Sequence, residues 1–170
     1  MKVLRTRRDS FRLVVGLLAA LGIAAGVALA APARPAKASD RTIEFRNVRT
    51  DAERFIDYSN SIRLTPAQER IKAEALEGIP APCCSEYTMA TCCCPCNLAK
   101  SAWGLSNYLI AKKGASAGEV RVAVQRWLKV VNPGGFSGDV CSKGGCNRPF
   151  RQNGCGGMDQ TRVIVGDDVM

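Results

Sequence analysis

The stretch TMATCCCPCNLAKSAWGLSNYLI, residues 88–110, places a dense group of cysteines directly before a helical pattern. Four cysteines are crowded at its start: Cys92, Cys93, Cys94 and Cys96. From Asn97 onward the apolar residues recur at helical spacing. The pattern ends at Lys112-Lys113-Gly114, where cations and a glycine are typical of a helix C-terminus. The stretch predicts a helix over about 97–113 with sulfur atoms gathered at its N-terminus.

Three further segments carry the signature of a helix start. Each has a hydroxyl residue followed three positions later by an acid or amide, a pairing that satisfies the free amides of a first turn. The three pairs are Thr50 with Glu53, Thr65 with Gln68, and Ser116 with Glu119. We expect one helix from Pro66 to about Glu77, ended by Gly78, and another from about Ala117 to Val131.

The short connection between the helices expected at 97–113 and 117–131 predicts an antiparallel helical hairpin. Trp103 and Trp127 are expected in the core of this hairpin. Residues 134–157 hold eight glycines and three cysteines and few aliphatic side chains. They bury too little apolar surface to order alone, so disulfides or a metal must hold them.

The fold class predicted is therefore mainly α: a small helical bundle with an antiparallel helical hairpin and a Gly/Cys-rich irregular C-terminal tail. The expected domain organisation has three parts. Residues 1–38 form an export signal and linker, residues 39–133 a helical Cys-rich domain, and residues 134–170 the Gly/Cys-rich tail.

The first 38 residues have the pattern of an export signal. A basic segment precedes an 18-residue apolar run over 13–30, and small-residue cleavage patterns occur at 28–30 and 36–38. We expect a cleaved signal peptide and an exported protein, periplasmic or at the cell surface. If the signal is retained, the protein is membrane-anchored, because 18 apolar residues can just span a bilayer.

Charge and composition exclude several functions. Residues 1–38 carry seven basic side chains and one acidic side chain, so their removal lowers the net charge from +9 to about +3. No later cluster of Lys and Arg is interleaved with aromatic residues, which argues against a nucleic-acid partner. The chain has no histidine. This excludes His-based catalysis, mixed Cys/His zinc sites, and covalent c-type haem, which needs a C-x-x-C-H run.

Thiol–disulfide exchange is the first hypothesis for the cysteines. Cys93-Cys94-Pro95-Cys96 is a C-x-P-C motif at a helix start, where unpaired amides stabilise a thiolate and lower its pKa. Cys93 would attack a protein thiol substrate, and Cys96 would resolve the mixed disulfide.

Metal binding is the second hypothesis. Six thiols lie within fourteen residues: Cys83, Cys84, Cys92, Cys93, Cys94 and Cys96. Thiolates select soft metals, so zinc, copper or an iron–sulfur cluster are the candidate cofactors. The third hypothesis is a disulfide-stapled interaction module. Cys83 or Cys84 would then bridge to residues 92–96, while Cys141, Cys146 and Cys155 pair within the tail.

The order of elements resembles one known family. An export signal is followed by an extended Glu44-Phe45 segment, a helix, a C-x-x-C and a hairpin with a Gly-Ala-Ser-x-Gly-Glu-Val turn. Over residues 42–131 this is similar to the CcmH-type thiol oxidoreductases of cytochrome c maturation. The resemblance implies a three-helix domain that handles apocytochrome thiols, with Cys93 and Cys96 as the active pair. Cys92 stands where the family has an arginine, and the family has no counterpart of the tail.

The export signal makes a direct prediction. N-terminal sequencing of the protein from its native host should find a chain that begins near Ala31 or Ser39, because the two cleavage patterns end at residues 30 and 38. An intact Met1 in the membrane fraction would instead show that the segment is retained as an anchor.

Overall fold

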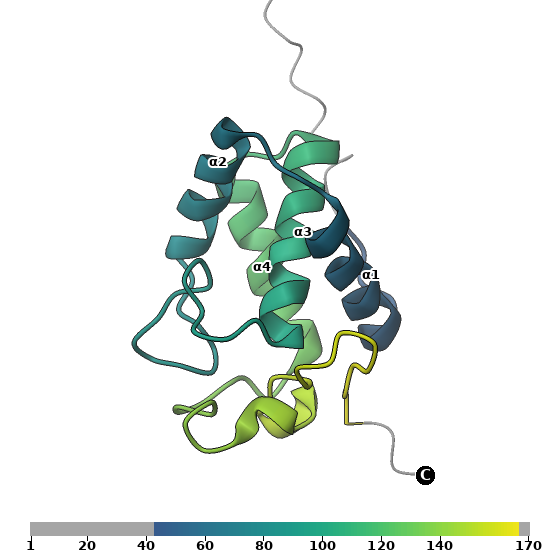
Figure 1. Ribbon diagram of the computed structural model, residues 1–170, viewed down its shortest axis with the longest axis vertical. Coiled ribbons are helices and arrows are strands. Elements are labelled where there is room, and N and C mark those ends of the chain that lie inside the picture. The colour runs from purple at the N-terminus through teal and green to yellow at the C-terminus, as the bar shows by residue number, and fades with distance from the viewer. Residues whose placement is uncertain (1–42, 167–170) are drawn as a thin grey trace, which may run out of the picture. The chain divides into compact units, whose positions relative to one another are not determined.

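The computed structural model describes residues 43–166, which form four α-helices followed by an irregular tail (Figure 1). The helices are α1 (Val48–Ser61), α2 (Pro66–Glu77), α3 (Asn97–Lys113) and α4 (Ala117–Val131). Two short 3₁₀ turns, η2 (Gly145–Asn147) and η3 (Phe150–Gln152), lie in the tail. Within 43–166 there is no β-strand, only an isolated antiparallel bridge between Pro80 and Thr88. The predicted fold class is confirmed.

The expected signal over 1–38 lies outside the described residues, as do the first residues of the predicted helical domain. Among residues 43–166, every helix is too short or too polar to cross a lipid bilayer. The described residues all fall within one compact unit.

Helix caps determine most of the helix boundaries. Both partners of the predicted capping boxes are in place at Thr65–Gln68 and Ser116–Glu119, and α2 and α4 begin directly after them. Gly114 ends α3 in the left-handed conformation at φ 62°. The boundaries of α2, α3 and α4 thus match those predicted from the sequence.

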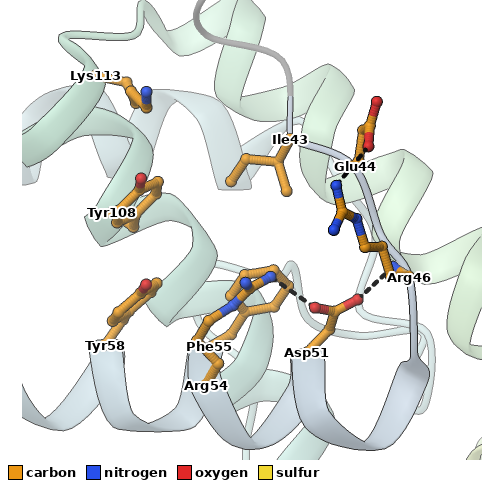
Figure 2. A pocket seen from close by; sticks show the side chains of 9 residues that line it. All are labelled: Ile43, Glu44, Arg46, Asp51, Arg54, Phe55, Tyr58, Tyr108 and Lys113. Carbon is orange, nitrogen blue, oxygen red and sulfur yellow. Dashed lines mark hydrogen bonds and ion pairs between the residues drawn. The ribbon is translucent and has the colours of Figure 1, made fainter.

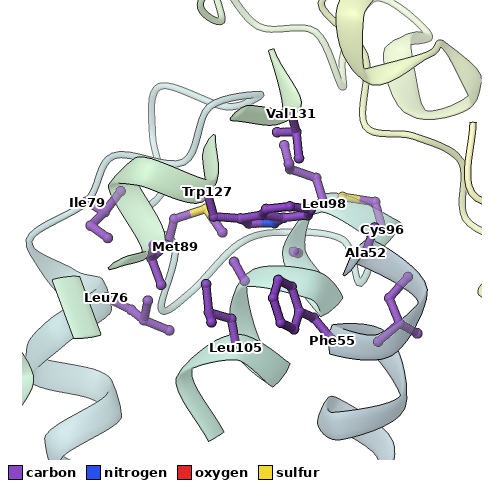
Figure 3. Packing of buried hydrophobic residues seen from close by; sticks show 14 of the residues in the cluster. Ala52, Phe55, Leu76, Ile79, Met89, Cys96, Leu98, Leu105, Trp127 and Val131 are labelled. Atoms are coloured by element: carbon purple, nitrogen blue, oxygen red, sulfur yellow. The ribbon is translucent and has the colours of Figure 1, made fainter. Parts of the chain in front are cut away.

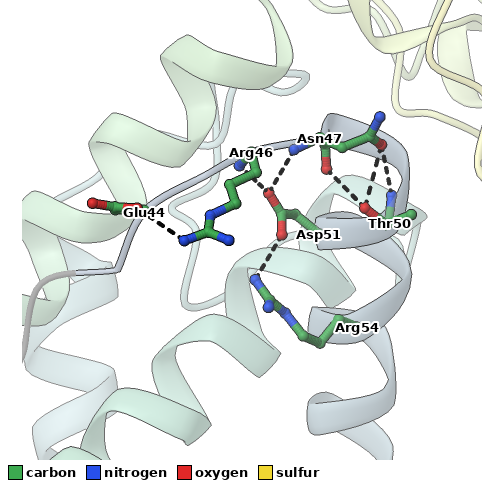
Figure 4. A network of polar contacts seen from close by, with 6 residues as sticks. All are labelled: Glu44, Arg46, Asn47, Thr50, Asp51 and Arg54. Atoms are coloured by element: carbon green, nitrogen blue, oxygen red, sulfur yellow. Dashed lines mark hydrogen bonds and ion pairs between the residues drawn. The ribbon is translucent and has the colours of Figure 1, made fainter.

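The start of α1 differs from the prediction. Thr50 is not the cap: Asn47 is, and its side chain accepts a hydrogen bond from the Thr50 amide. The buried carboxylate of Asp51 accepts the backbone amides of Arg46 and Asn47 at 2.8 and 3.1 Å, and it pairs with Arg54 at 2.6 Å (Figure 4). This carboxylate binds the amides that precede the helix, so α1 begins at Val48, upstream of the expected cap.

Helix α3 lies in the middle of the bundle, and its most extensive contact is with α1 (Figure 1). The two helices approach closely at Gly104. A Cβ atom there would overlap the backbone carbonyl oxygen of Phe55 and would lie 2.6 Å from the Ser59 amide nitrogen. The absence of a side chain at residue 104 therefore permits this packing.

Trp127 occupies the centre of the core (Figure 3). Its ring meets Phe55 edge-on at 5.1 Å between centroids, and its indole N–H donates to the Ser101 hydroxyl at 3.0 Å. Trp103 differs from the expectation because it is only half-buried. Its indole N–H donates to the Met89 carbonyl at 2.7 Å, so it fixes the loop before α3.

The close approach of α1 and α3 predicts opposite outcomes for two glycines. Gly104→Ala should destabilise the protein by at least about 2 kcal/mol, since the new methyl group meets backbone that cannot move without separating the helices. Gly118→Ala in α4 is the matched control. A Cβ there meets nothing, and the change should alter stability by less than about 1 kcal/mol. Urea unfolding followed by circular dichroism measures both; equal effects would contradict the packing described.

Candidate metal centre

The cysteines gather at the N-terminal end of α3. They come from four separate segments of the chain: residues 83–84, 92–96, 141–146 and position 155. All nine lie within the described residues, and all nine are free thiols. Figure 1 shows the loop between α2 and α3 and the tail meeting at this end of α3.

Backbone hydrogen bonds shape the loop between α2 and α3. Across the Pro80–Thr88 bridge, the Met89 amide donates to the Ile79 carbonyl and the Ala81 amide to the Tyr87 carbonyl, both at 2.9 Å. The bridge closes a turn that contains Cys83 and Cys84. The chain then reaches α3 at Cys96, the N-cap residue, which makes no side-chain capping bond.

The tail caps α3 in place of a side chain. The Asn97 and Leu98 amides donate to the carbonyls of Gly157 and Cys155 at 2.9 and 3.1 Å. The Asn97 side-chain amide, fully buried, donates to Gly156 at 2.9 Å and to Asp159 at 2.8 Å. The first-turn amides of a helix need partners, and here the tail supplies them. Cys155 is consequently held against Cys96.

The sulfur atoms form two triads that share one member. Within each triad all three sulfurs lie within 4.8 Å of one another: Cys83, Cys141 and Cys155 make one triad, and Cys93, Cys94 and Cys141 the other. The separations are 3.4 Å for Cys94–Cys141, 3.9 Å for Cys93–Cys94 and 4.0 Å for Cys141–Cys155. Two thiolates on one tetrahedral zinc, each with a Zn–S bond of about 2.3 Å, lie about 3.8 Å apart. The cluster therefore has the spacing of metal ligands and could bind a metal.

Burial divides the cluster into two parts. Cys83, Cys96 and Cys155 are at most 1 % exposed. Cys93 is exposed, and the other five cysteines are half-buried: Cys84, Cys92, Cys94, Cys141 and Cys146. Cys96 adjoins the apolar cluster around Trp127 and Leu98 (Figure 3). One side of the cluster thus faces the protein interior and the other faces solvent.

The pKa shifts are unequal among four sulfurs that interact with one another, those of Cys83, Cys92, Cys96 and Cys155. Hydrogen bonds from the other three thiols, chiefly Cys155, lower the pKa of Cys96, and the Ala99 amide of the first helical turn acts in the same direction. Hydrogen bonding to its three neighbours, Cys155 first, together with burial, raises the pKa of Cys83. Within this group the neighbouring thiols, and to a smaller extent the helix N-terminus, favour the thiolate form at Cys96 over the other three sulfurs.

The two members of the predicted exchange pair belong to different sides of the cluster. The sulfur of Cys96 interacts with those of Cys83, Cys92 and Cys155. The sulfur of Cys93 lies against those of Cys94 and Cys141. The exchange role of Cys93 and Cys96 stays a prediction.

The predicted metal ligands lie together: Cys83, Cys84, Cys92, Cys93, Cys94 and Cys96 all belong to the cluster. The tail adds three cysteines that the prediction left out, namely Cys141, Cys146 and Cys155. Disulfide pairing of these three within the tail stays a prediction: the sulfur of Cys141 lies 4.0 Å from that of Cys155, and also 3.4 Å from that of Cys94. One feature of the sequence could have indicated that the tail cysteines join the cluster: they lie in a segment with too few apolar residues to order alone.

A pocket of about 380 Å³ lies between α1 and the C-terminal half of α3, where Tyr58 and Tyr108 stack at 4.8 Å (Figure 2). No cysteine lines it. Arg46 and Arg54 project toward it, and each is paired with a carboxylate, Glu44 or Asp51. The pocket is lined by charged, aromatic and aliphatic side chains and offers no thiol ligand, so it is distinct from the sulfur cluster.

The capping role of Asn97 predicts a specific defect. Asn97→Asp keeps the size of the side chain but replaces its donor by a carboxylate that faces carbonyl oxygens. We expect a loss of about 1–3 kcal/mol, partly offset by the helix dipole, and faster proteolysis within residues 154–165. Gln125→Glu, the same amide-to-carboxylate change at an exposed position of α4, is the matched control. Equal cleavage rates in both variants would contradict the capping role.

Comparison of the chain with protein-family models, with known proteins and with solved structures gives no match. The resemblance to the CcmH-type oxidoreductases stays an expectation from the sequence.

Proposed function

We propose that this protein binds thiophilic metal ions of the zinc(II) or copper(I) class through its cysteine cluster. One observation carries the proposal. Nine free thiols from four separate chain segments meet at one helix end, and the successive sulfurs of Cys93, Cys94, Cys141 and Cys155 are 3.4–4.0 Å apart. Soft thiolates select soft or borderline metals, and the chain has no histidine to supply nitrogen ligands.

The compactness of the cluster favours ions ligated directly by several cysteines. In a four-iron cluster each cysteine binds a different iron, and the inorganic core separates the thiolates. Here the sulfurs of Cys94 and Cys141 are close enough to share one ion. Zinc and copper(I) therefore fit better than a four-iron cluster.

The tail supplies a second argument. It packs few aliphatic side chains, yet it brings Cys141 and Cys155 into the cluster. A metal that binds these two residues together with Cys83 would cross-link the tail to the helical core. Metal binding would then contribute directly to the folding free energy, as it does in small zinc domains.

Thiol–disulfide exchange is the alternative that the C-x-P-C motif favours. Cys93 is exposed, as an attacking thiol must be, but Cys96 is fully buried among three other sulfurs. A resolving thiol in this environment has competing partners, which favours shared ligation over exchange.

An exported location is part of the proposal and rests on residues 1–38 alone. Thiols in an oxidising compartment form disulfides unless they are ligated. Bound metal would keep nine neighbouring thiols from mispairing there.

Zinc binding by the reduced full chain tests the function. After incubation with Zn²⁺ and desalting, elemental analysis should find at least one zinc per chain, and iodoacetamide should modify the zinc-binding cysteines only after chelator is added. The zinc-loaded protein should also melt at a higher temperature than the metal-free protein.

A carboxylate variant provides the control. Asp139→Asn alters the acid that accepts the Ser85 amide and hydroxyl beside the cluster, and it should leave the zinc content unchanged. A protein that retains no zinc, and whose Cys96→Ser variant instead accumulates mixed disulfides on Cys93, would overturn the proposal in favour of thiol–disulfide exchange.

A further inference from the structure

Resting on the proposed function, we infer that the cluster binds two ions bridged by Cys141: a buried ion that is retained and an outer ion that exchanges with thiol-bearing acceptors through Cys93. The inference starts from the two sulfur triads. The inner triad is Cys83, Cys141 and Cys155, and the outer triad is Cys93, Cys94 and Cys141. A sulfur that belongs to both triads is the position expected of a bridging thiolate.

The inner triad has a fourth ligand at hand. The sulfur of Cys96 hydrogen-bonds with those of Cys83 and Cys155. Four thiolates complete a tetrahedral site for zinc. Three of these four residues are at most 1 % exposed, so an ion held by them is screened from solvent and from competing ligands.

The outer triad also has further sulfurs in reach. The sulfur of Cys84 interacts with that of Cys93, and the sulfur of Cys146 interacts with those of Cys94 and Cys141. The outer site differs from the inner one in access, because Cys93 is exposed and Cys94 and Cys141 are half-buried. An incoming thiol can reach this ion without unfolding the protein.

The exchange step is a ligand substitution with no change of oxidation state. An acceptor thiol binds the outer ion as a thiolate, and the metal–sulfur bond to Cys93 breaks. The proton released by the acceptor thiol is taken up by the departing Cys93 thiolate. The second thiol of a dithiol acceptor displaces Cys94 in the same way, and its proton passes to the Cys94 thiolate. The bond from the outer ion to Cys141 then breaks without proton transfer, because Cys141 stays a thiolate on the inner ion, and water or a second acceptor completes the coordination of the departing ion.

Zinc release from the loaded full chain tests the inference. Dithiothreitol is the acceptor, and a chromophoric chelator reports released zinc. We expect two phases of equal amplitude that differ in rate by at least tenfold, with only the fast phase accelerating as the dithiothreitol concentration rises. A carboxylate chelator without thiol should remove the outer ion more slowly, because it carries no sulfur ligand.

The variant Cys93→Ser tests the outer site by removing one of its sulfur ligands. Since Cys93 is exposed, the change leaves the core intact, and the variant should retain one zinc per chain and lose the fast phase. Ser85→Ala, an exposed position beside the cluster without a sulfur, is the matched control and should behave as the unmodified protein. Cadmium substitution gives a second measurement: ¹¹³Cd NMR should show two resonances for the unmodified chain and one for Cys93→Ser.

The outcomes separate the two claims. A chain that retains no zinc overturns the proposed function itself. If zinc binds but leaves in a single phase, or if Cys93→Ser releases it as the unmodified protein does, metal binding stands and the two-ion arrangement is wrong.

Discussion

The capping of α3 by the tail is the interaction on which the sulfur cluster depends. Helix α3 begins at Asn97, its N-cap residue Cys96 makes no side-chain capping bond, and its first amides donate to the carbonyls of Gly157 and Cys155. The same helix packs against α1 through Gly104, so one element anchors both the apolar core and the cluster. Any change that moves the α3 N-terminus therefore moves the sulfur ligands relative to one another.

The tail is held by polar contacts and by a few buried apolar side chains. The Asn97 side chain donates to its carbonyls, and the Arg49 guanidinium donates to the Val163 carbonyl. The buried apolar side chains of the tail include Val140, Phe150, Val163 and Val165. A net hydrogen bond contributes only about 1 kcal/mol to stability. Such contacts orient the tail, but they leave a large role for any metal that joins it to the loop before α3.

The helices were predictable from the sequence because local side chains fix their ends. The capping boxes at Thr65 and Ser116 and the glycine at 114 determine α2, α4 and the end of α3. Helix α1 was placed too late, since its start depends on Asp51 and on the amides that precede it rather than on Thr50. The Thr50–Glu53 pairing predicted the start of α1 incorrectly, because the Asp51 carboxylate accepts the backbone amides of Arg46 and Asn47 and the helix begins earlier.

The candidate site was only partly predictable for a different reason. The crowding of Cys92, Cys93, Cys94 and Cys96 is visible in the sequence, and it indicated sulfur chemistry. The sequence does not show that Cys141 and Cys155 join this group. Backbone carbonyls of the tail accept the first amides of α3, and every residue has a backbone carbonyl, so no sequence pattern indicates this contact. The separation of Cys93 from Cys96 likewise depends on which sulfurs the tail brings to each side.

The two sides of the cluster have different consequences for folding. An ion bound by Cys83 and Cys155 would close a loop of roughly 70 residues, and cross-links of that length stabilise by about 4 kcal/mol in the loop-entropy model. The outer ion, at Cys93 and Cys94, would bind the tail only through Cys141, which the inner ion already holds. Loss of the outer ion would therefore release little additional chain entropy. In the proposed arrangement, the buried Cys83, Cys96 and Cys155 would hold the ion whose loss unfolds the tail, and the exposed Cys93 would hold the ion that can leave while the fold persists.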